Sequence, residues 1–344
     1  MRSGYTFIFC LFGLLFFGPP GSLSGQDIHY SQFTNSPLNL NPAMTGTFRG
    51  DQRFSGIFRN QWSAVPVDYL QFGAAYDQRV HRRGEQYAPT NWALGGMLNY
   101  DRAGDGKMTM IQLAPSVSYT IPLAAKHGLA LGGNVSIAQR AFDDSALQFS
   151  SQYSNKKFDA SRPSNENFDE MSVWYPNAAL GADWHYQASE KRTTVDVGAG
   201  FNNLLTPEVA FYGDETHELP VRTSYHAEGT LQLADKFDLV LNGLHQRQGE
   251  YDETVLGVGG WLHLNTQRTQ ELALLLGVAT RLDDAIIPYL GLRMQNWRAA
   301  FSYDINTSGF DVATNGRGGP EFSLQHIITR VKPLEYCPLC PTFL

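Results

Sequence analysis

The sequence predicts an all-β protein: a single antiparallel transmembrane β-barrel of about 14 strands with an N-terminal plug segment. Three observations lead to this prediction. Charged residues make up only 17% of the chain, whereas glycine (33 residues) and aromatic residues (12%) are abundant; soluble domains carry about a quarter of charged residues. No apolar run after the first residues reaches the ~18 residues of a transmembrane helix. Instead, apolar residues alternate with polar or small ones in segments of about ten residues, as in strands with one lipid-facing side.

The first residues are typical of a secretory signal peptide. Arg2 precedes an apolar run at 5–17 that is too short to span a bilayer, and Ser22 and Ser24 fit the small-x-small cleavage rule. We therefore expect residues 1–25 to be removed and the barrel to reside in the Gram-negative outer membrane. Without Arg2 the chain has 25 basic and 33 acidic side chains. Nucleic acid is excluded as a partner, because its binding needs a basic face.

The mature protein opens with Q-D-I-H-Y-S-Q-F-T-N-S-P-L-N-L-N-P-A-M-T-G at 26–46, which follows neither a strand nor a helix period. Pro37 and Pro42 cannot donate to a sheet ladder, and each disfavours the α conformation in the residue before it. The stretch has enough apolar surface to be buried, and its Asn and Gln side chains can pair its backbone groups. We expect residues 26–50 to form an ordered plug; a floppy leader is the alternative.

The strands are expected to follow one another from residue 51 to residue 331. In the first, Phe54 and Phe58 alternate with Arg53 and Arg59. The predicted strands are 51–62, 68–78, 91–100, 109–119, 129–137, 177–186, 194–201, 221–232, 239–248, 254–264, 271–281, 286–294, 298–305 and 319–331. An even number puts both ends of the barrel wall on the same side of the membrane. The same alternation places several charged residues inside, where they are expected to pair across the lumen: Arg53, Arg59, Arg79, Asp183, Asp196, Arg222 and Glu228.

Connector lengths suggest an orientation. Short connectors at 122–128, 187–192, 233–238, 265–270 and 295–297 alternate for much of the chain with longer ones at 80–90, 142–170, 202–220 and 306–318. Outer-membrane barrels have short periplasmic turns and long external loops. We therefore expect the longer connectors outside the cell and the tail, residues 332–344, in the periplasm.

No cofactor, metal or catalytic constellation is predicted. The histidines stand singly, and a hydrolase would need a nucleophile and a base on neighbouring strands, which spacing cannot establish. Cys337 and Cys340 lie in a C-P-L-C sequence in the tail. In an oxidising compartment a local disulfide is the default, with inert thiols as the next alternative. A zinc site would need two more ligands, and none lies nearby.

A second motif lies near the end of the chain. A predicted hairpin carries polar residues at alternate positions, and its Asn-Gly and Gly-Gly pairs supply positive φ angles. Its residues are Tyr303, Asp304, Asn306 and Ser308, then Asn315, Gly316 and Gly318, then Glu321 and Ser323. The first motif comprises Ser31, Gln32, Phe33, Pro37, Leu38, Asn41, Pro42 and Gly46. Together the two motifs resemble the PorP/SprF family, outer-membrane proteins of the type IX secretion system of Bacteroidetes. The cysteine-containing tail departs from the family pattern.

The resemblance implies a non-enzymatic barrel that works with type IX secretion components and, in some members, with gliding motility. Its expected partners are the secretion apparatus, outer-membrane lipid and a secreted surface protein or adhesin, with loops 142–170 and 202–220 on the cargo side. The alternative is an outer-membrane transporter of hydrophobic solutes resembling the fatty-acid channels. An apolar pocket between plug and wall would favour the transporter, and a densely hydrogen-bonded plug would favour the anchoring role.

Overall fold

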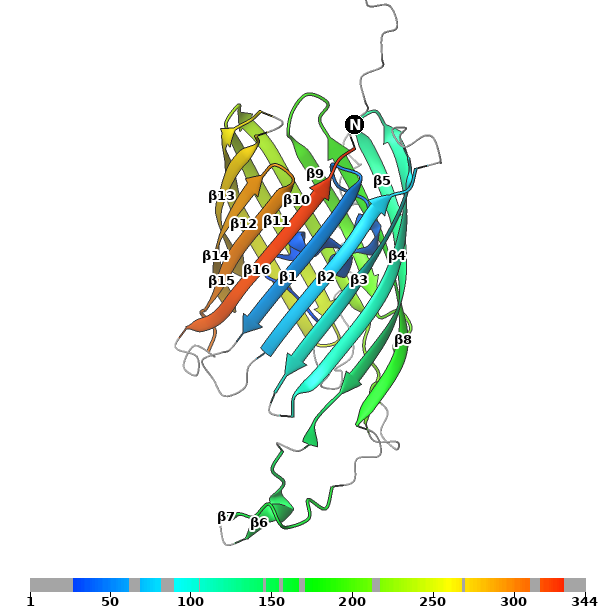
Figure 1. Ribbon diagram of the computed structural model, residues 1–344, viewed down its shortest axis with the longest axis vertical. Coiled ribbons are helices and arrows are strands. Elements are labelled where there is room, and N and C mark those ends of the chain that lie inside the picture. The colour runs from blue at the N-terminus through cyan, green and yellow to red at the C-terminus, as the bar shows by residue number, and fades with distance from the viewer. Residues whose placement is uncertain are drawn as a thin grey trace, which may run out of the picture.

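The computed structural model describes residues 27–61, 69–81, 90–104, 106–144, 147–154, 157–166, 171–211, 217–267, 270–309 and 316–330. Within these residues, fourteen antiparallel strands close into one barrel (Figure 1). Neighbouring strands in the barrel are also neighbours in the chain, and β1 closes the wall by pairing with β16. The predicted fold class is confirmed.

The barrel strands match the fourteen predicted ones, with small differences at their ends. They are β1 (Gln52–Gln61), β2 (Tyr69–Arg79), β3 (Trp92–Ala103), β4 (Met108–Ala124), β5 (His127–Ala141), β8 (Ser172–Gln187), β9 (Thr194–Asn202), β10 (Arg222–Ala234), β11 (Phe237–Gln248), β12 (Tyr251–Asn265), β13 (Leu272–Arg281), β14 (Ala285–Met294), β15 (Trp297–Asn306) and β16 (Arg317–Ile328). A separate two-stranded hairpin, β6 (Tyr153–Ser154) with β7 (Lys157–Phe158), follows the 3-10 helix η4 (Ser150–Gln152) in the β5–β8 loop.

One difference concerns the start of β8, which lies five residues before the predicted start at residue 177. The added residues pair with β5, from Ala141 opposite Ser172 to Ile137 opposite Pro176. Proline usually interrupts a strand because it lacks an N–H group. Pro176 is tolerated because its nitrogen points to the side of β8 that faces β9, where no strand pairs with it. Pairing with β9 begins only at Leu180.

The alternation of side chains produces the expected apolar belt. Leu274, Leu276 and Val278 of β13 are exposed on the outer face, whereas Ala273 and Ala279 are buried on the inner face. Aromatic pairs lie near the end of the barrel where β1 begins: Trp297 stacks on His326, with ring centroids 4.2 Å apart. Such aromatic girdles mark the membrane interface of outer-membrane barrels. None of the described helices is both long enough and apolar enough to cross a membrane.

The structure places the predicted short connectors at one end of the barrel and the predicted longer ones at the other, with one exception. The β2–β3 connector, predicted at 80–90 as an external loop, must lie at the end where β1 begins, because β2 returns to that end. Conversely, the β3–β4, β11–β12 and β13–β14 connectors lie at the opposite end and are short. The β5–β8 and β9–β10 connectors do lie at that opposite end, and Figure 1 shows β6 and β7 protruding beyond it.

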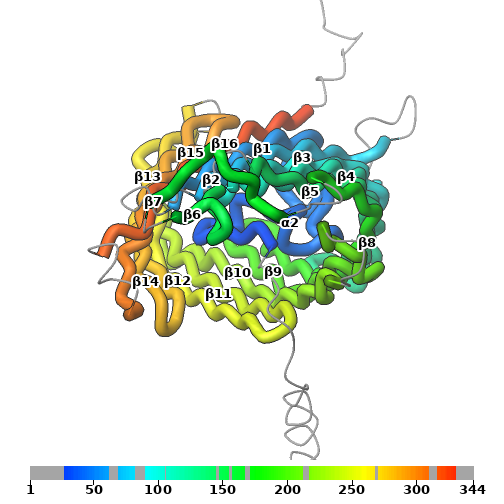
Figure 2. The backbone as a smooth tube through the Cα atoms, turned by 90° about the horizontal axis from the view of Figure 1, so that it is seen from below, coloured from blue at the N-terminus to red at the C-terminus, as the bar shows by residue number. Residues whose placement is uncertain are grey.

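The N-terminal residues lie inside the ring of strands (Figure 2). We call residues 27–50 the luminal segment. It contains the 3-10 helix η1 (Phe33–Asn35), the one-turn helix α2 (Pro37–Leu40) and the 3-10 helix η2 (Pro42–Met44). Phe33, Leu40 and Met44 form an apolar cluster with inward-facing residues of the wall, including Val255 and Ile287. The predicted leader, residues 1–25, and the predicted tail, residues 332–344, lie outside the described residues.

Candidate functional site

The luminal segment is irregular because its sequence both starts and stops helices within a few residues. Pro37 is the first residue of α2, where a missing N–H costs nothing, and Pro42 opens η2 in the same way. Between them, the Asn41 side chain accepts a hydrogen bond from the backbone N–H of Ala43 (2.9 Å) and donates one to the Ala182 carbonyl of β8 (2.9 Å). Asn41 therefore ends one helix, caps the next and ties both to the wall.

Two carboxylates of the last two strands hold the start of this segment. The Glu321 carboxylate accepts the backbone N–H groups of Ser31 (2.9 Å) and Gln32 (2.6 Å). The Ser31 hydroxyl donates to Asp304, and the Gln32 side-chain amide donates to the Ser302 hydroxyl (2.9 Å). Hydrogen bonds to charged acceptors are roughly twice as strong as neutral ones. The two sequence motifs, 273 residues apart at their nearest bonded pair, Ser31 and Asp304, thus meet as one buried network.

Arginines of the wall balance the charge of these carboxylates. Arg59 of β1 donates to Asp304 at 2.7 Å, and Arg281 of β13 donates to the same carboxylate at 3.2 Å. Arg281 also lies 3.0 Å from Glu253. Asp304, Glu321 and Arg59 are fully buried. Removing one member would leave an unpaired buried charge, so the group stabilises the barrel only as a complete set.

His29 lies beside this network but contributes little charge to it. Its Nε2 lies 3.6 Å from the Glu253 carboxylate. Burial, together with nearby Arg59 and Arg281, lowers the pKa of His29, although Glu253 acts in the opposite direction. The imidazole is therefore mostly neutral near pH 7, and Arg281 rather than His29 compensates Glu253.

The far end of the luminal segment has its own anchor. Arg53 of β1 forms a two-bond ion pair with Asp77 of β2 (2.9 and 2.8 Å) and also donates to the Met44 carbonyl (3.2 Å). Asp77 in turn accepts the backbone N–H of Gly46 at 2.7 Å. Gly46 has a φ of +76°, and a Cβ atom there would collide with Ala93 of β3. Only glycine fits this turn without strain.

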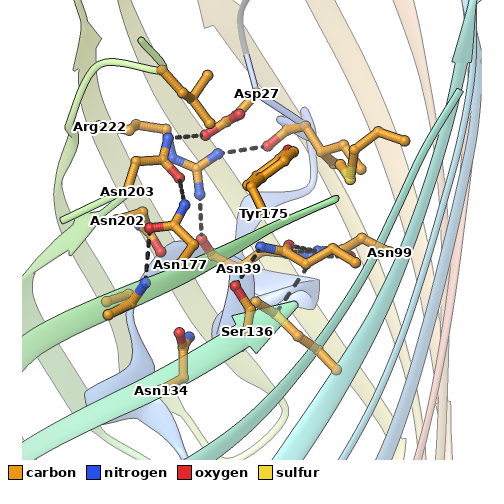
Figure 3. Close-up of a pocket in the computed structure, with 17 residues that line it drawn as sticks. Asp27, Asn39, Asn99, Asn134, Ser136, Tyr175, Asn177, Asn202, Asn203 and Arg222 are labelled. Atoms are coloured by element: carbon orange, nitrogen blue, oxygen red, sulfur yellow. Dashed lines mark hydrogen bonds between the residues drawn. The ribbon is translucent and has the colours of Figure 1, made fainter. Parts of the chain in front are cut away.

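A third set of contacts surrounds a small polar cavity on the opposite side of the segment (Figure 3). Arg222 of β10 donates to the Ile28 and Asn39 carbonyls, both at 2.8 Å. Asn203 donates to the Asp27 carboxylate and accepts from Asn177. The cavity measures about 30 Å³, and amide side chains are the most numerous of the polar groups that line it. That is room for about one water molecule.

The other predicted motif residues occupy separate positions. Phe33 and Leu38 pack in apolar clusters, Ser323 bonds to the Gln32 side chain, and Ser308 bonds to Asp284. Tyr303 lies on β15 and faces outward, in the opposite phase to Asp304. Asn306 is the last residue of β15, Gly316 has a φ of +73° before β16, and Gly318 is buried on β16. Asn315, Cys337 and Cys340 lie outside the described residues.

Three network members were not singled out from the sequence: Asp77, Glu253 and Arg281. Asp77 and Arg281 lie in the inward phase of predicted strands, whereas Glu253 lies one residue before the predicted start of its strand at residue 254. The partners of all three could not be predicted. The interior charges predicted from the sequence do not pair with one another across the lumen, which contradicts the prediction. Arg53 and Asp183 bind side chains of nearby strands, and Arg222 binds the luminal segment. They do not pair across the lumen, because the luminal segment lies there.

The family of the Type IX secretion system membrane protein PorP/SprF matches residues 22–324. These residues contain the whole luminal segment and nearly all of the wall, including the buried network. The chain belongs to the PorP/SprF family. This PorP/SprF protein is accordingly an outer-membrane β-barrel of the type IX secretion system, and the predicted resemblance to the family is confirmed. No curated protein matches the sequence.

Several solved structures are similar to this PorP/SprF protein in fold. The P. putida toluene transporter TodX has a TM-score of 0.49 at 10% identity, over 86% of this chain and 95% of that chain. The Ralstonia pickettii toluene transporter TbuX gives 0.47 at 10% identity, over 86% and 94%. A Pseudomonas aeruginosa FadL homologue gives 0.46 at 12% identity, over 83% and 91%. These likenesses carry no argument about function.

The network leads to a first testable prediction, at Gln32. Its side chain contacts Ser302, Ser323, Asn35 and the Glu321 carbonyl, all at 2.6–3.0 Å. Gln32→Ala is expected to destabilise the barrel by about 1–3 kcal/mol, because buried groups lose their partners. The measurement is guanidinium unfolding of the protein in detergent micelles, followed by tryptophan fluorescence.

The matched control is Gln78→Ala at the barrel rim. Gln78 also bonds through its side chain, to Gln52 and Tyr76, but its surroundings are accessible to solvent. Its replacement should change stability by about 0.5 kcal/mol or less. Equal effects of the two substitutions would show that the contacts of Gln32 add nothing to the stability of the barrel.

Proposed function

We propose that this chain is a non-enzymatic, plugged barrel that supports the secretion or cell-surface attachment of a partner protein by the type IX secretion system. Its partners in this proposal are secretion-system components on the periplasmic side, an adhesin-like secreted protein on the outer side and outer-membrane lipid around the belt. Residues 1–25 are the cleaved leader, 26–50 the plug, 51–331 the barrel and 332–344 a periplasmic tail.

The observation that carries the proposal is the way the luminal segment is held. Charged side chains from β1, β2, β10, β13, β15 and β16 bind it directly, and its apolar residues fill the one large apolar cluster inside the barrel among the described residues. A barrel that only has to insulate the membrane while its two ends engage partners requires such a fixed plug. A solute channel requires a path around it.

The alternative function, transport of hydrophobic solutes, has less support. It requires an apolar pocket between segment and wall. Where the structure describes this region, the cavity beside the segment is about 30 Å³ and polar. The more open hollow, lined by Phe54, Tyr76, Leu98 and Trp297 among others, lies on the outer face of the wall and does not reach the segment.

The loop between β5 and β8 provides the test of the proposal. It protrudes furthest from the outer end and has its own internal structure: Arg162 donates to the Tyr153 carbonyl, and Asp159 accepts from Ser161. Deleting residues 147–166 is expected to release the partner protein into the medium, while the barrel keeps its heat-dependent shift in gel mobility. Release is measured as the ratio of secreted protein in medium and cells.

A control deletion of residues 82–89 shortens a connector at the opposite end of the barrel. It should leave the partner on the cells. Unchanged retention after the deletion of 147–166 would argue against a role of the outer loops in attachment. Failure to recover any secreted protein with the intact barrel from native membranes would overturn the proposed function itself.

A further inference from the structure

At the outer end of the described wall, part of β8 has a strand partner on one side only. β8 pairs with β5 over its full length, from Tyr186 to Ser172. On its other side it pairs with β9 only from Gln187 to Leu180, so residues 172–179 have no strand partner there. β9 stops because Asn203, with a φ of +60°, turns the chain away from the sheet; asparagine tolerates this conformation better than most residues.

In the orientation of the proposed function, this edge lies at the cell-surface side of the membrane. β9 has nine residues, about the length a tilted strand needs to cross the hydrocarbon core. The unpaired part of β8 extends past the end of β9 in the outward direction, and Figure 1 shows β5 and β8 reaching further toward that end than β1 and β16. The edge is therefore outside the hydrocarbon core, within reach of proteins at the cell surface.

Among the residues that the structure describes, only those at the innermost part of the edge form hydrogen bonds on this side. The Ala178 carbonyl accepts the backbone N–H of Leu204, and the Ala178 N–H donates to the side chain of Asn177. Because successive residues of a strand point their backbone groups to opposite sides, Ser172, Trp174 and Pro176 point theirs in the same direction as Ala178. No described residue bonds to their backbone groups on this side.

We propose that this edge, residues 172–177, binds an extended segment of the secreted surface protein as an added β-strand. The inference rests on the proposed function and specifies its site. The edge offers three carbonyl acceptors and, since Pro176 has no N–H, two donors. A row of backbone donors and acceptors is complementary to another extended backbone, and strand addition uses such edges.

The side chains beside the edge add a preference for the partner. Trp174 is 62% exposed on the outer face of β8, and Pro176 is exposed on the same face. An added strand would place every second side chain next to them. The partner segment is therefore expected to carry apolar or aromatic residues at alternate positions on that face.

The test separates the backbone of residue 174 from its side chain. Trp174→Pro removes one edge N–H but no bond to β5, as Pro176 already does two residues further on. Trp174→Ala keeps the N–H and removes only the ring. The expected result is a fall of about tenfold in the amount of secreted protein recovered with the full-length barrel for Trp174→Pro. Trp174→Ala should change recovery by about twofold or less.

Wild-type recovery with Trp174→Pro would overturn the inference, and so would an equal fall with both variants, since the ring would then be the contact. A photo-crosslinking amino acid at position 172 or 176 gives a readout that does not depend on how well the proline variant folds. Strand addition requires the two positions to reach partner residues four apart in one segment. Crosslinks that are absent or scattered would overturn it. If no secreted protein accompanies even the wild-type barrel, the proposed function fails as well.

Discussion

Asp304→Ala is expected to destabilise the folded barrel by about 3–5 kcal/mol, the cost typical of breaking a buried ion pair from one side. Asp304 is fully buried and accepts hydrogen bonds from Arg59, Arg281 and the Ser31 hydroxyl. Without it, two guanidinium groups stay in the interior with fewer carboxylates than they need. The change is measured as the shift in the guanidinium unfolding midpoint of the protein in micelles.

Asp284→Ala is the matched control for this prediction. Asp284 pairs with the same Arg281 at 2.8 Å, but its side chain is 42% exposed. An ion pair that water can replace contributes about 1 kcal/mol or less. Midpoints shifted equally by the two substitutions would contradict the view that burial, rather than pairing alone, gives Asp304 its effect.

Gly132→Val is expected to dislodge the luminal segment and open a conducting path. Gly132 of β5 faces inward, and a Cβ atom there would lie 2.5 Å from the Ala43 Cα and from the Pro42 carbonyl oxygen. Both of these are backbone atoms of η2, so the whole turn has to move. Overpacking of this kind costs about 1–3 kcal/mol. Single-channel recording in planar lipid bilayers should detect ion conductance that the wild-type protein lacks.

Gly56→Val tests the same substitution on the other face of the wall. Gly56 of β1 has no atom within 4 Å of its added Cβ position. This variant should remain as closed as the wild type. Conductance that is equal in both variants, or a wild-type barrel that already conducts, would contradict the role of the segment as a plug.

The strands were predictable because the membrane imposes a simple rule on them. Each residue of a transmembrane strand faces either lipid or the interior. In β13, for example, Leu274 and Leu276 face lipid, whereas Ala273 and Leu275 face the interior, so the pattern of exposure follows the strand period. The even strand count and the antiparallel order then follow from closure. Propensity alone was misleading at Pro176, where only the absence of a neighbouring strand explains why a proline belongs to β8.

Connector lengths were a weaker guide. Nothing physical requires all connectors at one end of a barrel to be short, and the one at 80–90 is longer than the others at its end. The direction of each strand, which follows from its position in the order, decides on which side a connector lies. Counting strands from β1 would have placed 80–90 at the same end as the short connectors.

The candidate site was only half visible in the sequence. Ser31, Gln32, Asp304 and Glu321 stood out as polar residues within two motifs, but their meeting depends on barrel closure, which brings β15 and β16 next to β1. Arg281 was the last residue of one predicted strand and Glu253 preceded the start of another by one residue, so neither was singled out. Their roles depend on which inward-facing residues of different strands lie at the same height along the barrel axis. That height depends on the tilt and register of the strands, which the spacing of residues along the chain does not give.

The carboxylates that receive the start of the chain stand on its last two strands, β15 and β16. During insertion, therefore, the luminal segment cannot form all of its hydrogen bonds until the hairpin of β15 and β16 has folded. If the segment acts as the proposed plug, an unfinished barrel would conduct ions, and the barrel would close only at the last step of assembly. Any factor that stalls the terminal hairpin would compromise the envelope as well as secretion.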